Sequence, residues 1–258
     1  MQYRGNKFRT LLEIHREVDN WLVAFAMRLF RKHAGLNLLR FKRGLNLICR
    51  GGNRDWDVVH ELFFAGGYRT AFDYLRSSEG EGMVLDLGGN IGCFSLLAAE
   101  CRSGITVRAF EPGPPNARLF RMNQLANSGI GSRIELVEAA VAGRDGEITW
   151  FFDEENPGGS GLFADKGIPS QVKIHSFSEV IESITQPILL VKIDIEGSEY
   201  DLLQDANEAI WQKIPALSLE LHNDPAGKVT RKDFLNKMEN FGYRIREESV
   251  CSYFLIKK

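Results

Sequence analysis

The feature of this sequence that most constrains its fold is a repeated alternation of apolar and mixed segments after residue 82. The mixed segments between the apolar runs carry helical periodicity, so the chain reads as strand, helix, strand. Such alternation favours an α/β fold with a mostly parallel sheet and helices on both faces. Two segments near the C-terminus predict an antiparallel hairpin that closes the sheet. The predicted buried strands are 82–86, 106–110, 133–137, 188–193 and 217–221, and the hairpin strands are 243–246 and 253–256. A further short strand is predicted at 147–152, and a helix is predicted over 200–211.

Composition is compatible with a globular protein and excludes several other classes. The 258 residues are 44% hydrophobic and 26% charged, close to the averages for globular proteins. No apolar run approaches the roughly 20 residues that span a bilayer, and the N-terminus lacks a secretory signal. Four scattered cysteines form no C-x-x-C pair, so neither a zinc signature nor a disulfide framework is present. We therefore expect a cytoplasmic protein with free thiols.

The first part of the chain, residues 1–54, differs in charge from the predicted α/β domain at 55–258. Residues 1–50 carry a net charge of +8 and the remainder carries −10. We expect one amphipathic helix over 6–33 and a short hairpin before residue 51.

One side of this predicted helix carries Trp21, Leu22, Phe25 and Leu29. A stripe of this width is rarely left in water. We expect it to be buried on the chain's own body or at a homodimer contact, and we rank contact with an anionic membrane third.

The turn after the strand at 82–86 reads DLGGNIG over residues 86–92. Its glycines let the backbone approach a ligand closely, and the following helix presents free N–H groups. The spacing differs from the dinucleotide signature G-x-G-x-x-G, and a carboxylate, Asp86, comes immediately before the turn. A carboxylate suits a cationic ligand better than a pyrophosphate. S-adenosylmethionine carries an ammonium and a sulfonium group, so it fits this turn.

Glu111 ends the next strand, about 20 residues beyond the glycine turn. An acidic residue at this place accepts hydrogen bonds from both ribose hydroxyls, which indicates a nucleoside without a 2′-phosphate. NAD would satisfy the same carboxylate.

Three segments together resemble the FkbM family of methyltransferases. They are residues 86–95, residues 109–112 together with Asn116, and the motif VKIDIEGSE at 191–199. Residues 156–161 and 220–222 are weaker matches, and the resemblance covers roughly 55–223. It implies a Rossmann-like class I methyltransferase fold with a seven-stranded sheet and S-adenosylmethionine as cofactor. The cofactor-binding residues that we predict are Asp86, Gly88, Gly89, Asn90, Gly92, Glu111, Ala139 and Asp194.

Asp194 ends the signature strand, where the resemblance places the transferred methyl group. Candidate bases for an acceptor hydroxyl are His222, Asp194 and Glu196, and His222 normally titrates nearest to neutral pH. Asp194 with Asp224 or Glu220 could instead hold a divalent cation. Because no recognisable ligand triad is present, we predict no metal.

The leading hypothesis is O-methylation of a hydroxyl group on a small molecule, sugar or glycan. One alternative is an NAD-dependent oxidoreductase, which the glycine spacing disfavours. Another is a nucleic-acid-binding or RNA-modifying protein that uses the basic N-terminal segment. That segment's aromatic residues follow its apolar side, so we expect no nucleic acid.

Residues 156–161 predict either a lid over the acceptor or a plain surface loop.

Overall fold

The structure is a computed structural model that describes residues 7–29, 35–52, 54–152, 168–224 and 227–258. Within these ranges, no helix is both long and apolar enough to cross a membrane. The predicted lid or loop at 156–161 lies outside the described residues.

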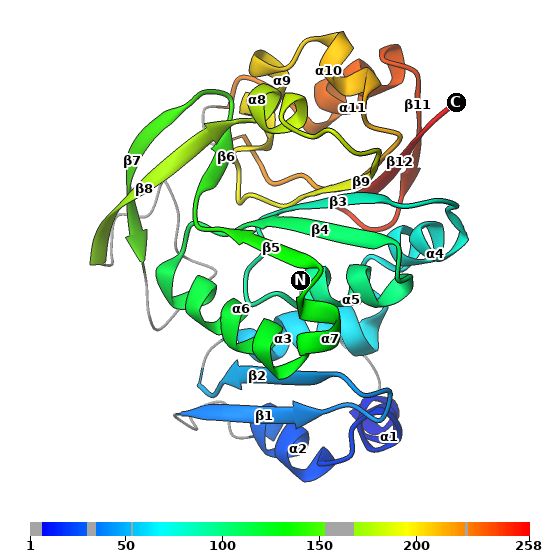
Figure 1. Cartoon of the computed structure of the whole chain (residues 1–258), viewed down its shortest axis with the longest axis vertical. Helices are drawn as coiled ribbons and strands as arrows, with labels where there is room; N and C mark the ends of the chain where they lie inside the picture. The colour runs from blue at the N-terminus through cyan, green and yellow to red at the C-terminus, as the bar shows by residue number, and fades with distance from the viewer. Residues whose placement is uncertain (1–6, 30–34, 53, 153–167, 225–226) are drawn as a thin grey trace.

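A seven-stranded sheet occupies the centre of the molecule, in the order β11-β12-β10-β9-β3-β4-β5 (Figure 1). Strand β12 runs antiparallel to its neighbours β10 and β11, whereas the pairs formed among β10, β9, β3, β4 and β5 are parallel. The predicted mostly parallel sheet with an antiparallel C-terminal hairpin is therefore confirmed. The strands are β3 (Gly82–Leu87), β4 (Ile105–Phe110), β5 (Ile134–Val137), β9 (Ile188–Ile193), β10 (Ala216–Glu220), β11 (Tyr243–Glu247) and β12 (Ser252–Lys257).

Helices cover both faces of this sheet, as predicted. On β3, Val84 belongs to a core shared with α4, α5 and α6, and the next residue, Leu85, belongs to a core shared with α8 to α11. All six residues of β3 are buried, as expected for a central parallel strand with helices on both sides. The helices are α4 (Arg69–Ser77), α5 (Cys93–Cys101), α6 (Pro114–Ala126), α7 (Ser128–Gly131), α8 (Phe177–Glu182), α9 (Glu199–Asp205), α10 (Glu208–Gln212) and α11 (Arg231–Asn240).

Two of the predicted helices are interrupted. The helix predicted over 6–33 is two helices, α1 (Lys7–Glu17) and α2 (Trp21–Leu29), because Val18 forms a β-bridge with Phe41. The helix predicted over 200–211 is α9 and α10, because extended backbone at Asn207 separates them, and the Asn207 side chain caps α10. In both cases a local break overrides the helical periodicity.

The N-terminal hairpin packs on α6 through asparagine side chains. The hairpin strands are β1 (Leu36–Arg40) and β2 (Asn46–Arg50), and they pair only with each other among the described strands. On the other edge of β2, the Asn123 amide accepts from Ile48 N–H and donates to Ile48 C=O. Asn127 makes the same pair of bonds with Asn46. Two side-chain amides thus replace a third strand at this edge.

The N-terminal helices bury a different side from the predicted one. Ile14, Val18, Ala24 and Met27 face the core, while Trp21, Leu22 and Leu29 are exposed. The chain's own body leaves these three residues of the predicted stripe exposed and half-buries the fourth, Phe25, because the buried side of α2 carries Ala24 and Met27. Burial at a homodimer contact stays a prediction.

A second sheet of three strands lies beside the main sheet (Figure 1). Its strands are β6 (Ala140–Ala142), β8 (Ile168–Ser176) and β7 (Gly146–Phe152), in that order. Only β7 was expected from the sequence. Two elements between β2 and α4 complete the chain, helix α3 (Asp55–His60) and the π-helical turn η1 (Glu61–Ala65).

Candidate cofactor and acceptor site

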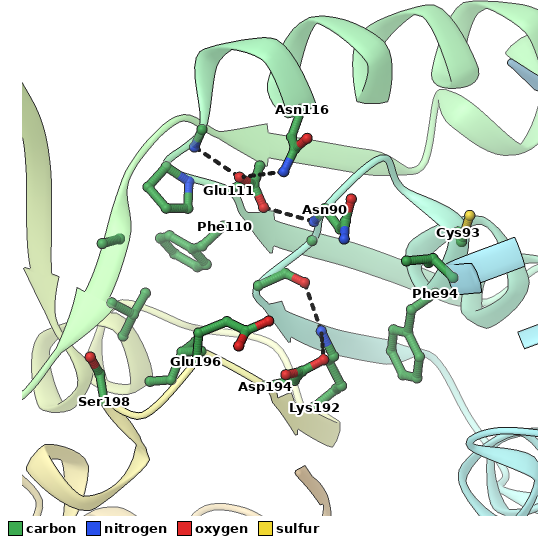
Figure 2. A pocket seen from close by; sticks show the side chains of 18 of the residues that line it. Asn90, Cys93, Phe94, Phe110, Glu111, Asn116, Lys192, Asp194, Glu196 and Ser198 are labelled. Carbon is green, nitrogen blue, oxygen red and sulfur yellow. Dashed lines mark hydrogen bonds and ion pairs between the residues drawn. The ribbon is translucent and has the colours of Figure 1, made fainter. Parts of the chain in front are cut away.

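A cavity opens at the carboxyl ends of β3, β4 and β9, the edge at which ligands bind in sheets of this kind (Figure 2). Strand β6, the end of β2 and the helical segment from α3 to Tyr68 complete its walls. Three predicted site residues, Asp86, Gly92 and His222, are absent from its lining. The predicted residues that line it are Gly88, Gly89, Asn90, Glu111, Ala139, Asp194 and Glu196.

The turn after β3 requires glycine at position 88. Gly88 has φ +88°, and a Cβ there would clash with the backbone carbonyl oxygen of Asp194. The N–H groups of Gly88 and Gly89 both donate to the carbonyl of Phe110, at 3.0 and 2.8 Å. The turn is thus tied to the end of β4 and pressed against the end of β9, which leaves its other side open to the cavity. Gly92 packs on the Phe120 ring instead and does not line the cavity.

Glu111 is held as a buried hydrogen-bond acceptor at the end of β4. One carboxylate oxygen accepts from Asn90 N–H at 2.8 Å, and the other accepts from Gly113 N–H at 2.8 Å and from the Asn116 amide at 3.3 Å (Figure 2). Burial raises the pKa of Glu111 to about 7, although these hydrogen bonds act in the opposite direction. The carboxylate is therefore fixed in place at the cavity wall before any ligand arrives.

Asp86 does not reach the cavity. Its carboxylate is fully buried, 3.2 Å from the ammonium of Lys192, and accepts a 2.6 Å hydrogen bond from Ser95. This arrangement differs from the predicted direct contact with a cationic ligand. Asp86 instead holds Lys192, whose ammonium also donates to the carbonyl of Gly88 at 2.7 Å. Burial alone would lower the pKa of Lys192, but the charges of Asp86 and Asp194 more than offset this effect and raise it.

Asp194 lies where β9 ends, with its side chain partly exposed to the cavity. Its Oδ2 atom lies 3.6 Å from the Lys192 ammonium and accepts a 3.2 Å hydrogen bond from the Tyr68 hydroxyl. Burial and the charge of Asp194 hold the pKa of Tyr68 well above its usual value, so Tyr68 remains a donor. Glu196 lies on the same side of the cavity, where its carboxylate is half-exposed.

His222 lies behind the cavity wall and forms a pair with Glu199. Its Nδ1 atom is 3.0 Å from the Glu199 carboxylate, and its Nε2 atom is 3.5 Å from Glu196. The hydrogen bond to Glu199 is the largest influence and raises the pKa of His222 to about 9, against the opposing effect of burial. An imidazole with this pKa is already protonated at neutral pH. His222 does not line the cavity, whereas Asp194 and Glu196 do, and the identity of the base stays a prediction.

Asp194, Glu199 and His222 each place one potential metal-ligand atom within 4.8 Å of the others. The Glu199 carboxylate, however, already accepts from the N–H groups of Ile195 and Gly197 as well as pairing with His222. These internal bonds already occupy the Glu199 carboxylate, and the absence of a metal stays a prediction.

Two of the lining residues that were missed in the sequence lie outside every motif. Arg50 ends β2 in the N-terminal segment 1–54, and Glu61 lies in the π-helical turn η1. No motif marks either one, because each reaches the cavity only through tertiary packing. Asn116, Tyr68 and Lys192 lie within the region that resembles the family, but none of them was predicted as a site residue.

The antiparallel strand β12 lies between β10 and β11, and the cavity opens at the ends of β3 and β4. This strand order and this site define a class I methyltransferase fold. The Methyltransferase FkbM domain family matches residues 86–245. The chain belongs to this family and is an S-adenosylmethionine-dependent methyltransferase.

Several proteins resemble this chain. It is 25% identical over 190 residues to Methyltransferase 1 of Beauveria bassiana, covering 65% of this chain and 74% of that protein. It is 28% identical over 173 residues to the 31-O-demethyl-FK506 methyltransferase FkbM of Streptomyces tacrolimicus, covering 55% and 65%. The crystal structure of Methyltransferase FkbM from Methylobacillus flagellatus has 17% identity and a TM-score of 0.47, covering 68% of this chain and 43% of that chain.

The buried pair of Lys192 and Asp86 generates a stability prediction. Lys192→Met leaves a buried carboxylate without its cation, and we expect it to cost about 3–5 kcal/mol of unfolding free energy in urea denaturation. Lys213→Met, at an exposed lysine, should change stability by less than about 0.5 kcal/mol. Lys192→Met combined with Asp86→Asn should cost less than Lys192→Met alone. A Lys192→Met protein as stable as the control would contradict this assignment.

The pair of His222 and Glu199 generates a pH prediction. Because the folded pKa of His222, about 9, lies above the ordinary value of about 6.5, the pair stabilises the fold fully below pH ~6.5. This stabilisation should be lost as pH rises through about 9. Glu199→Gln should remove most of the pH dependence of the unfolding free energy. Urea unfolding at pH 6.5 to 9.5 and NMR titration of the imidazole measure both effects. A His222 that titrates near 6.5 in the unmodified protein would refute the pairing.

Proposed function

We propose that this methyltransferase binds S-adenosylmethionine across the ends of β3 and β4 and methylates a hydroxyl oxygen. The single observation that carries the proposal is the position of two carboxylates, Glu111 and Asp194, on either side of the glycine turn in one cavity. Glu111 is placed to accept hydrogen bonds from ribose hydroxyls. The small residues at 139–142 would contact the adenine.

The charge of the lining suits a cationic donor. Glu111, Asp194, Glu196 and Glu61 all line the cavity, and its cations, Lys192 and Arg50, are each already paired with a buried aspartate. A sulfonium and an ammonium would reduce the repulsion among these carboxylates, whereas a pyrophosphate would add to it. This difference supports S-adenosylmethionine over NAD.

The same charges restrict the acceptor. An anionic acceptor, such as a phosphorylated sugar or a nucleic acid, would meet the carboxylates of Glu61, Asp194 and Glu196. A neutral molecule with several hydroxyl groups would instead donate hydrogen bonds to them. We therefore propose a neutral, hydroxyl-bearing small molecule, sugar or glycan. The relative from Streptomyces tacrolimicus carries an O-demethyl substrate in its name, which supports an oxygen acceptor.

Asp194 is the base that we propose. When bound, the cofactor supplies an electrophilic methyl group on sulfur. Lys192 and Tyr68 hold Oδ2 of Asp194, which fixes the carboxylate beside the cavity. The acceptor hydroxyl would lose its proton to Asp194 as its oxygen attacks the methyl carbon in line with the departing sulfur. Glu196 would orient the acceptor through a second hydrogen bond.

The decisive experiment combines binding with turnover. Calorimetry should show micromolar binding of S-adenosylhomocysteine (SAH) by the purified protein, on the order of 8 kcal/mol, and none of NAD. With methyl-labelled cofactor and a panel of neutral polyols and sugars, mass spectrometry should identify a methylated product. Asp194→Asn should lower turnover by about 10²–10⁴-fold while changing the SAH dissociation constant far less. Tight NAD binding without SAH binding would overturn the proposal.

A further inference from the structure

Arg50 links the N-terminal hairpin to the cofactor cavity. It is the last residue of β2, it lines the cavity, and its side chain is 18% exposed. Its Nε and Nη2 atoms donate to the two oxygens of Asp55 at 3.0 and 2.8 Å, and its backbone N–H donates to the same carboxylate. Asp55 is 2% exposed, so this bidentate pair fixes the plane of the guanidinium group.

The same guanidinium reaches the proposed ribose-binding residue through one intermediate. Nη2 of Arg50 donates a 2.7 Å hydrogen bond to Oδ1 of Asn116, and Nδ2 of Asn116 donates to Oε1 of Glu111 at 3.3 Å. An amide can donate only from its nitrogen, so the bond from Arg50 selects the orientation in which Asn116 donates to Glu111. The opposite orientation would place an amide oxygen against the carboxylate.

The position of Arg50 is also fixed by a second asparagine of α6. Asn123 binds Ile48 of β2 and donates a second bond of 2.8 Å to the carbonyl of Ile91 in the glycine turn. Strand β2, α6 and the turn are therefore held to one another by the same side chains. Residue 50 lies outside the region 86–245 that matches the family.

We propose that Arg50 is a positioning residue for the cofactor's ribose, acting through Asn116 on Glu111. This inference rests on the proposed cofactor site. The N-terminal hairpin then belongs to the cofactor site and is more than a support for the fold. Lysine cannot replace Arg50, because one ammonium group cannot bind Asp55 in bidentate fashion and also reach Asn116.

The test compares two ligands, SAH and its 2′,3′-dideoxy analogue, which lacks the hydroxyls that Glu111 would bind. Calorimetry gives the ratio of their dissociation constants for each variant of the full chain. The unmodified protein should prefer SAH by at least about tenfold. In Arg50→Gln and Arg50→Lys we expect SAH to bind about tenfold more weakly and the analogue to bind almost unchanged, so the ratio falls towards one. Arg50→Lys keeps a positive charge beside Asp55, so it provides the test if Arg50→Gln does not fold.

A merely structural role for Arg50 gives a different result. If either folded variant binds both ligands more weakly by the same factor, the ratio of the two dissociation constants stays constant and the inference is overturned. In an Asn116→Ala background, Arg50→Gln should lower the ratio no further, and an undiminished effect there would exclude Asn116 as the intermediate. The control variant is Arg43→Gln, at the exposed end of the same hairpin. It should leave the dissociation constants of both ligands within twofold of those of the unmodified protein. An unmodified protein that binds neither ligand would overturn the cofactor proposal itself, and the inference with it.

Discussion

The buried ammonium of Lys192 is the contact on which the rest of the site depends. It lies 3.2 Å from the carboxylate of Asp86, donates to the carbonyl of Gly88 and lies 3.6 Å from Asp194. A buried charge is tolerated only with partners in good geometry, so these three segments have one favourable arrangement. That arrangement presses the turn after β3 against the end of β9 so closely that only glycine fits at position 88. The open side of the turn then lines the cavity.

This geometry separates two kinds of carboxylate. Asp86 is fully buried and neutralised by Lys192, whereas Glu111 and Asp194 face the cavity. On the proposed function, the cavity carboxylates favour the positively charged donor. Transfer of the methyl group leaves a neutral thioether, so the same carboxylates hold the product less strongly. One charge pattern would thus serve both donor binding and product release.

The parts of the fold that local patterns control were predictable. Buried strands followed by Gly-rich turns located β3 and β4, and strand-end carboxylates identified Glu111 and Asp194 as cavity residues. Pairings between distant segments were not predictable. The bridge from Val18 to Phe41 breaks a periodic helix, and β8 alternates buried Val172 and Ile174 but gains a partner only through packing with β6 and β7. The contribution of Arg50 and the partner of His222 likewise depend on tertiary contacts that spacing alone does not reveal.

The central claim is that a nucleoside donor lies across the glycine turn with its ribose on Glu111 and its sulfur towards Asp194. A crystal structure of the protein with bound SAH tests this claim most directly. The account predicts both ribose hydroxyls within about 3 Å of the Glu111 carboxylate oxygens, and the sulfur on the side of the cavity lined by Asp194. A ligand bound elsewhere, or bound with its ribose turned away from Glu111, would contradict the account.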